Sequence, residues 1–383
     1  MKPAENRNPA LDVIRCVACF GVVAVHFLLK SGFYGEPVTG GRMIAMVFYR
    51  AAFMYCVPLF MILSGYLLCR KKLEWGFYKR IGKVLFVYCA ASLFCLYGYP
   101  ALYALLRGPL GLPDPGPSPV GVKDAVLQIL GFTAAPYAWY VEMYLGLFLF
   151  IPFLNILYSH IPTKRGKQLL LLIGAVVSML PSVVNVYSFE RLGWWLRPTV
   201  TDAKGELYGL SKLIPAWWTG IYPLTCYFIG CWLREYGLRL RSRVNALGIV
   251  LTVAVSGAYS LWRSAGIKFV SGAWTGWNSP FSIVLAALIF TFFLNLDYSR
   301  TPGAVKRVLA WISELSLGAY LVSWVFDQLF YPVLARRQPV VFRRLDACVL
   351  IVPLVFVCSL LVSWVIQWLY RLWRWFCGRL RKQ

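Results

Sequence analysis

The sequence has little charge and very few histidines. Charged residues make up 14% of its 383 residues and only 15 residues are acidic, whereas soluble domains contain about 25% charged residues. The 11 cysteines fall almost wholly inside apolar blocks, which excludes the spaced pairs of a secreted disulfide scaffold. The two histidines leave too few ligands for a metal site, and we expect no metal.

What the sequence does have is long apolar blocks. Hydrophobic residues make up 60% of the chain, and the mean hydropathy is +0.64. A spanning helix needs about 20 mostly apolar residues, and ten blocks qualify, which predicts an all-α polytopic membrane protein. The blocks lie at residues 10–29, 44–69, 81–106, 137–160, 168–187, 214–233, 245–262, 280–297, 308–332 and 346–370.

The basic residues predict the orientation of these helices. With the N-terminus inside, the inner segments hold 23 lysines and arginines and the outer loops hold 14. Short basic loops mark the cytoplasmic side, so an even number of helices places both termini in the cytoplasm. The net charge of +24 is spread over these short clusters, which are typical of cytoplasmic loops. We therefore expect the lipid bilayer as a partner and no nucleic acid.

The longer outer connections differ in composition from the inner ones. Residues 108–117 are rich in proline and glycine and predict a stiff, turn-rich connection. Residues 188–213 contain Trp194, Trp195, Asp202 and Glu206, which either line a carbohydrate-facing mouth or anchor helix ends at the interface. No internal repeat or soluble appendage is visible, so we expect one membrane domain over residues 1–383, with its core at about 8–370.

The first helix carries two ionisable residues on one face. It begins at Asn8-Pro9, a helix cap followed by proline, and we expect it to be retained because it lacks a cleavage site. Arg15 and His26 are eleven residues apart, which is about 20° from three full turns and about 16 Å along the axis. A charge at mid-bilayer costs about 2.5–3.5 kcal/mol on insertion scales, so both residues indicate a function.

Structural explanations compete with that interpretation. Arg15 can instead snorkel to the interface or pair with Asp12, and His26 can be a satisfied core histidine. Cys16 and Cys19 have the spacing of a redox motif, but they lie within the helix without a second pair. We assign these cysteines to packing.

Four stretches of the chain stand out as motifs. The first is NPALDVIR at residues 8–15, followed by ten residues and His26. The others are VPLFMILSGYLL at 57–68, WYVEMYLGLFLFIP at 139–152 and LGAYLVS at 317–323. In content and order these stretches resemble the membrane acyltransferase-3 family, whose hallmark is arginine, ten residues and histidine in the first helix.

The resemblance implies a reaction across the membrane. The family moves an acyl group, usually acetyl, from cytoplasmic acyl-CoA to a hydroxyl of an extracytoplasmic glycan or lipid-linked sugar. It implies a multi-pass protein of the bacterial inner membrane, here without an attached hydrolase-like (SGNH) domain. It makes His26 the general base, worth about 10²–10⁴-fold, or a transient acyl carrier, with Arg15 on the same face.

CoA carries phosphates, so a basic cytoplasmic mouth is expected. Between the second and third helices, Lys79-Arg80-Ile-Gly-Lys83 lies where the family often has Arg-x-x-Arg. Arg80 matches the motif, while Lys83 departs from it and loses the bidentate fork. Arg70 begins the preceding Arg-Lys-Lys cluster. Ordinary positive-inside charge is the alternative explanation for all of these residues.

Other polar residues inside the spans have less specific interpretations. Glu142, near the outer side, either orients His26, accepts a sugar hydroxyl, or is a snorkelling acid at a helix end. Arg50 and Asp327 either pair with each other or line the cavity. Ser64-Gly65 indicates a close helix contact. Ser323 stands where many relatives have histidine.

Two other classes of protein share these features. A transporter or flippase of an envelope lipid or polysaccharide has a similar number of helices and similar intramembrane charges. Inverted repeats with broken helices would favour it, and none is visible. A non-catalytic sensor or scaffold is the third possibility, and it predicts that His26→Ala has no effect.

Overall fold

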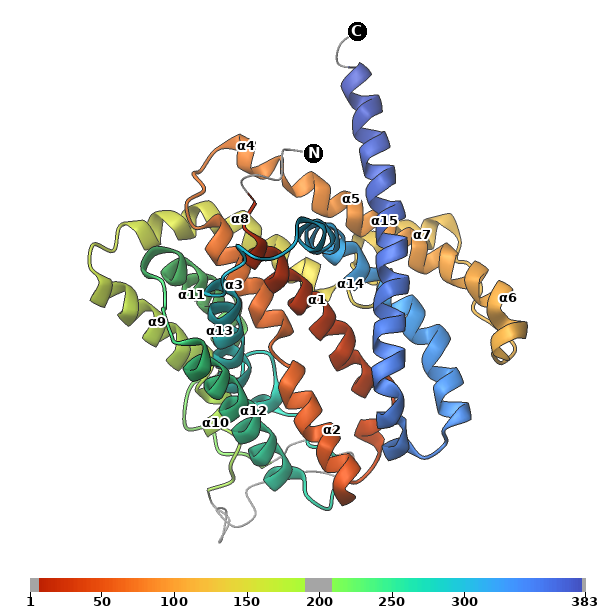
Figure 1. Ribbon diagram of the computed structural model, residues 1–383, viewed down its shortest axis with the longest axis horizontal. Coiled ribbons are helices and arrows are strands. Elements are labelled where there is room, and N and C mark those ends of the chain that lie inside the picture. Colours follow the sequence, from red (N-terminus) through yellow and green to blue (C-terminus); the bar gives the residue numbers. More distant parts are fainter. Residues whose placement is uncertain (1–6, 190–208, 381–383) are drawn as a thin grey trace. The chain divides into compact units, whose positions relative to one another are not determined.

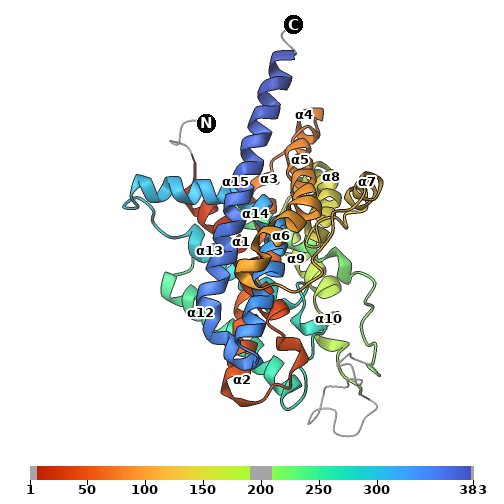
Figure 2. The ribbon, with the colours of Figure 1, turned by 90° about the vertical axis from the view of Figure 1, so that its right-hand side faces the viewer.

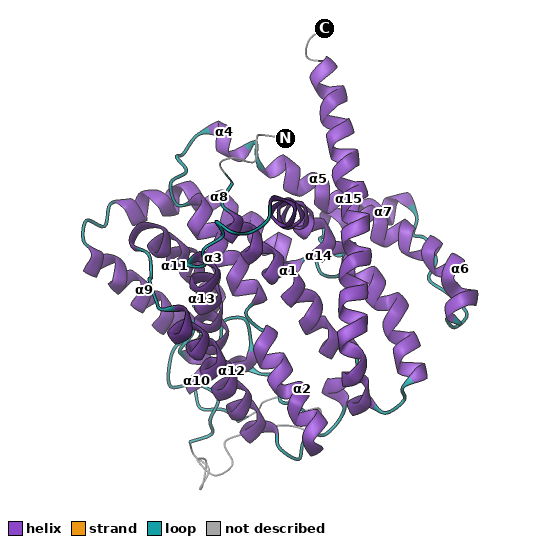
Figure 3. Ribbon diagram, viewed as in Figure 1, coloured by secondary structure: helices purple, strands orange, loops and turns teal. Residues whose placement is uncertain are grey.

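The computed structural model describes residues 7–189 and 209–380 of the chain (Figure 1). The structure is 76% helical, and the described residues contain no strand, so helices joined by loops make up the fold (Figure 3). The expected all-α fold is confirmed. Trp194, Trp195, Asp202 and Glu206 lie outside the described residues.

The helices follow one another along the whole described chain. Their bounds are α1 Pro9–Lys30, α2 Gly40–Phe53, α3 Cys56–Leu68, α4 Trp75–Tyr78, α5 Ile81–Leu93, α6 Tyr99–Leu110, α7 Val122–Leu130, α8 Trp139–Ser159, α9 Lys164–Ser178, α10 Pro181–Val184, α11 Tyr222–Tyr236, α12 Ser242–Ser264, α13 Pro280–Leu294, α14 Gly303–Arg337 and α15 Cys348–Leu380. Short helical turns lie at η2 Phe33–Gly35, η3 Phe94–Gly98, η4 Thr219–Ile221, η5 Ala273–Thr275 and η6 Val341–Ala347. α15 runs as one long helix in both views (Figures 1 and 2).

Eight helical segments of the described chain are long and apolar enough to cross a membrane, which makes this a multi-pass membrane protein. They correspond to eight of the ten expected spans. The expected spans 214–233 and 280–297 overlap α11 and α13, which have 15 residues each. That length is about 22 Å at 1.5 Å per residue, against a hydrocarbon core of about 30 Å. The count of ten is therefore not confirmed, and the location of the termini stays a prediction.

Prolines explain why two of the expected spans are interrupted. The second span begins at Gly40 and breaks between Phe53 and Cys56. Pro58 lacks the N–H that would bond to the carbonyl four residues earlier, at Met54, and its ring clashes there. Pro100 follows the π-helical turn η3 in the same way, because a widened turn accommodates the missing bond.

Contacts between residues divide the chain into two compact units. The first unit contains residues 1–72 and 150–306, and the second contains residues 73–149 and 307–383. In the first unit, α1 packs against α2, α3 and α13, and α11 packs against α3 and α9. In the second unit, α5 packs against α7 and α15. The expectation of one domain stays a prediction.

The closest helix contact in the first unit joins α3 to α11 through glycine. A Cβ added at Gly65 would overlap the carbonyl oxygen of Tyr227, and a Cβ at Gly230 would overlap that of Ile62. Small residues let two helix backbones approach in this way where lipid provides no hydrophobic drive for association. The predicted contact at Ser64-Gly65 is therefore confirmed, with Gly230 as its counterpart.

Gly65→Ala and Gly230→Ala should each lower the thermal midpoint of the detergent-solubilised protein. Overpacking a tight contact costs about 1–3 kcal/mol, and the clashing atoms here belong to backbone rather than to flexible side chains. Gly146→Ala in α8 is the matched control, because nothing lies within 4 Å of its added Cβ. Equal midpoints for all three variants would contradict the glycine contact.

Candidate active site

The helix that carries the candidate catalytic face is unbroken. The Asn8 side chain accepts a hydrogen bond from the backbone N–H of Ala10 at 3.0 Å, Pro9 occupies the first turn, and α1 then continues to Lys30. The predicted cap is thus confirmed. Because the helix is continuous, the spacing of eleven residues places Arg15 and His26 on one face.

The middle of that face is buried. Cys19 and Val22, which lie between the two residues on the same stripe, are 0% and 4% exposed. Arg15 and His26 are both half-buried, and the Nδ1 atom of His26 is buried. With Nδ1 buried, Nε2 is the ring nitrogen that we expect to meet a bound molecule.

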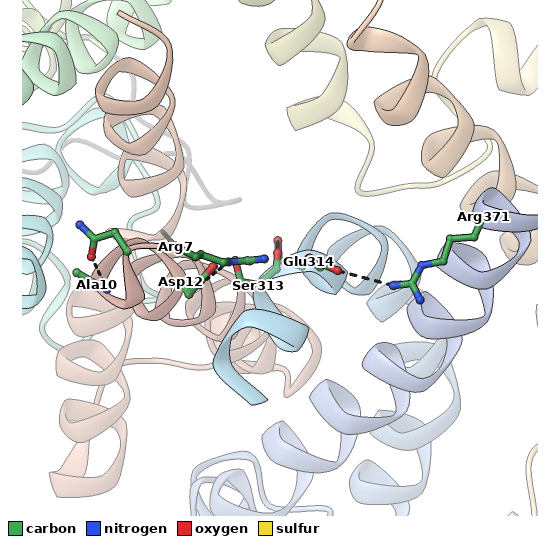
Figure 4. Close-up of polar contacts among 8 residues, drawn as sticks. Arg7, Ala10, Asp12, Ser313, Glu314 and Arg371 are labelled. Atoms are coloured by element: carbon green, nitrogen blue, oxygen red, sulfur yellow. Dashed lines mark hydrogen bonds and ion pairs between the residues drawn. The ribbon is translucent and has the colours of Figure 1, made fainter. Parts of the chain in front are cut away.

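The start of α1 holds a buried carboxylate. Both oxygens of Asp12 accept hydrogen bonds from the Arg7 guanidinium, at 2.7 and 2.6 Å (Figure 4). Asp12 is 4% exposed, and a bidentate pair is the strong form of this contact. Figure 4 also shows a longer, more exposed pair between Arg371 and Glu314 in the second unit, at 3.8 Å. Arg7 is a partner of Asp12 that the sequence analysis did not suggest.

Arg50 and Asp327 each have a partner within their own unit. Arg50 Nε donates to the Tyr34 hydroxyl at 2.8 Å in the first unit. Asp327, which is 0% exposed in the second unit, accepts a hydrogen bond from the Tyr137 hydroxyl at 2.7 Å. Tyr320 donates to the carbonyl of Tyr137. The last two contacts fix the chain just before α8.

The basic residues expected at the donor site are exposed. Lys79 and Arg80 lie between α4 and α5, and Lys83 lies in the first turn of α5, where its Nζ is 6.0 Å from the ring centroid of Tyr370. The structure brings these three residues of the second unit together by local chain geometry. Arg70 is exposed just after α3 and belongs to the first unit. Their role in binding CoA stays a prediction.

Glu142 is exposed in the first turn of α8, which begins at Trp139, and it belongs to the second unit. An acidic side chain in the first turn also stabilises the helix through its dipole. That contribution explains the residue without catalysis. Its interaction with His26 stays a prediction.

Asn155 is a site residue that the sequence analysis missed. Its Nδ2 donates to the carbonyls of Leu68 and Lys71, both at 2.8 Å, and its Oδ1 accepts from the Tyr227 hydroxyl at 2.6 Å. Asn155 is 6% exposed. It therefore fixes the end of α3 and the turn that carries Arg70. The signal available in the sequence was a single amide within an otherwise apolar run of α8.

A second group of contacts ties α9 to α11 close to this turn. Lys167 Nζ donates to both oxygens of Glu235, at 2.7 and 2.8 Å, and lies 4.6 Å from the ring centroid of Tyr158. Burial disfavours the charged form of Glu235, but the hydrogen bonds from Lys167, the positive charge of Lys167 and the neighbouring tyrosines together outweigh it and hold the pKa of that carboxyl below its usual range. The guanidinium of Arg234 lies 4.9 Å from the ring centroid of Tyr66 in α3.

Asn155→Ala should destabilise the protein by about 1–3 kcal/mol, because two partly buried carbonyls and the Tyr227 hydroxyl lose their partner. The thermal midpoint in detergent measures this loss. Tyr227→Phe, which removes one of the three bonds, should cost about 1 kcal/mol. Ser159→Ala is the control, since Ser159 is exposed and bonds only its own helix. An Asn155→Ala midpoint equal to that of the control would contradict this role.

The model of the Acyl_transf_3 family, described as an acyltransferase domain, matches residues 8–368. No curated protein and no solved structure matches the chain. Among the described residues, no group of three histidine, cysteine, aspartate or glutamate side chains is placed to hold a metal ion.

Proposed function

The chain belongs to the acyltransferase-3 family, and from that premise we propose that it transfers an acetyl or longer acyl group across the membrane. The donor is cytoplasmic acyl-CoA, and the acceptor is a hydroxyl of an extracytoplasmic glycan or lipid-linked sugar. The family establishes a membrane acyltransferase. The donor, the acceptor and the direction of transfer are the proposed part, as is a location in the bacterial inner membrane.

One observation carries the proposal: an unbroken membrane helix presents Arg15 and His26 on a single face, with the buried residues Cys19 and Val22 between them. The two residues are separated by about 16 Å along the axis, roughly half of the hydrocarbon core. In the predicted orientation, Arg15 lies toward the cytoplasmic donor and His26 toward the acceptor. A single helix thus offers polar groups to both substrates.

The chemistry needs a base near the acceptor hydroxyl. In direct transfer, His26 Nε2 takes the hydroxyl proton while the oxygen attacks the thioester carbonyl, the carbon–sulfur bond breaks, and the proton passes to the CoA thiolate. In covalent transfer, Nε2 attacks the thioester first and the acyl-imidazole then reacts with the hydroxyl. Both routes end in an ester and free CoA, and both require His26.

The exposed basic residues Lys79, Arg80 and Lys83 support the donor side of the proposal. Solvent-exposed cations suit the phosphates of CoA, which arrive from water. Arg70 follows α3, and the hydrogen bonds of Asn155 hold the turn in which it lies. These charges would thus hold the phosphates of the bound acyl-CoA.

His26→Ala should abolish acyl transfer while the protein remains inserted, because loss of a positioned base costs about 10²–10⁴-fold. The test measures incorporation of radiolabel from acetyl-CoA into envelope material by membranes with matched expression. His160→Ala is the control, since His160 is the chain's other histidine and is exposed at the end of α8. Normal turnover by His26→Ala would refute the mechanism.

Arg15→Lys should reduce transfer about tenfold or more, because a point charge does not reproduce the planar fork of a guanidinium. Arg300→Lys, an exposed substitution of the same type, should retain full activity. Initial rates at saturating acetyl-CoA compare the two. Equal rates would reduce Arg15 to an interfacial anchor.

A further inference from the structure

Two loops of the first unit meet beside the end of α1 that carries His26. They contain residues 31–39 and 265–279, and together we call them the cap. The backbone N–H of Val38 donates to the carbonyl of Ile267 at 2.8 Å, and the N–H of Gly266 donates to the carbonyl of Val38 at 3.2 Å. Phe33 contacts Phe269, with ring centroids 5.2 Å apart. The cap is thus joined by backbone and by side chains.

A single buried arginine fastens both loops of the cap. Arg50 lies in the last turn of α2 and is 9% exposed. Its Nε donates to the Tyr34 hydroxyl at 2.8 Å, and its Nη1 donates to the carbonyl of Thr275 at 3.1 Å. The guanidinium also lies 5.0 Å from the ring centroid of Phe269. One side chain therefore contacts both loops at once.

The partners of Arg50 indicate that this position needs hydrogen-bond donors. Within residues 7–189 and 209–380, its hydrogen bonds go to a hydroxyl and a carbonyl, and no carboxylate forms an ion pair with it. A buried cation without a counter-ion is costly, whereas an apolar side chain would fill the space at no such cost. The directional N–H groups of the guanidinium are what this position uses.

The cap lies against the segment that contains His26. The turn η2 packs on α1, and the backbone N–H of Ser31 donates to the carbonyl of Phe27 at 2.8 Å. Phe27, the neighbour of His26, contacts Tyr49 with ring centroids 5.8 Å apart. Tyr49 in turn precedes Arg50. Phe27, next to His26 in the chain, thus links α1 both to the cap and to the helix that carries Arg50.

We propose that the cap forms the acceptor side of the site and that Arg50 is the positioning residue that holds it closed. This inference rests on the proposed function and on its orientation, in which the His26 end of α1 faces the acceptor. Arg50 touches neither donor nor acceptor. It sets where the acceptor hydroxyl meets the imidazole and keeps bulk water away from the acyl group.

A loosened cap has a distinct chemical signature. The acyl group then meets water as well as the acceptor hydroxyl: the water oxygen bonds to the acyl carbon, the carbon–sulfur bond breaks, and the products are free carboxylic acid and CoA. Loss of Arg50 should therefore weaken use of the acceptor and raise the share of acyl groups lost to water. The binding of acyl-CoA, on the cytoplasmic side, should not change.

The test compares Arg50→Lys, Arg50→Gln and Tyr34→Phe with the wild type. Arg42→Lys is the matched control, since Arg42 lies exposed on the same helix. The concentrations of radiolabelled acetyl-CoA and of heat-treated envelope extract are varied in turn. The radiolabel in free acetate and in esterified acetate is measured in each assay. Arg50→Gln should raise the apparent KM for extract about tenfold, as expected for lost hydrogen bonds to a charged group, with the KM for acetyl-CoA unchanged. Tyr34→Phe should show a smaller effect of the same kind.

Hydrogen–deuterium exchange of the purified full chain separates this inference from the proposed function. Peptides covering 31–39 and 265–279 should exchange faster in Arg50→Gln than in the wild type, whether or not any acyl group is transferred. Unchanged exchange would overturn the role of Arg50 in the cap. Faster exchange with both KM values raised alike, or with no rise in acetate, would overturn its role at the acceptor. A wild type without any transfer would refute the proposed function and the acceptor role with it, while the exchange result would still stand.

Discussion

The hydrocarbon core offers no hydrogen-bond partner, so every polar group inside it must be satisfied by the chain itself. That constraint accounts for the helical structure of the spans and for the hydrogen bonds that their few buried polar side chains make. Asn155 uses its amide on two carbonyls and a hydroxyl, and Arg50 uses its guanidinium on a hydroxyl and a carbonyl. Each of these residues joins segments that lie far apart in the sequence. The hydrogen bonds of these buried polar groups therefore also determine which helices and loops pack together.

The same constraint gives α1 its distinctive character. One face carries Arg15 and His26, separated by buried Cys19 and Val22. The helix is fixed at its start by the side chain of Asn8 and at its end by the packing of the loop at residues 31–39. A rigid helix with fixed ends holds two polar groups at a constant separation. Such a scaffold suits a reaction whose two substrates approach from opposite sides of the bilayer.

Composition and periodicity predicted the all-α membrane fold, eight of its spans and the start of α1, because these features depend on local sequence. The contact at Gly65 was also predicted, although its counterpart Gly230 was not. The π-turn at Phe94–Gly98 was missed because it lies inside an apolar block that predicts one continuous helix. Helix α7 at Val122–Leu130 was missed because its nine residues are too few for a span. The partners of Arg50 and Asn155 depend on contacts between residues 16 to 225 positions apart, which no local pattern reports. The catalytic and donor-binding roles of the candidate residues stay predictions.

Transfer of an acyl group from one side of the membrane to the other is tested most directly in sealed membrane vesicles of both orientations, with radiolabelled acetyl-CoA added only to the outside medium. We expect labelled acceptor inside inverted vesicles, whose cytoplasmic face is exposed, and little label in vesicles of native orientation. Label incorporated equally in both orientations, or only in the native one, would contradict transfer from a cytoplasmic donor to an extracytoplasmic hydroxyl.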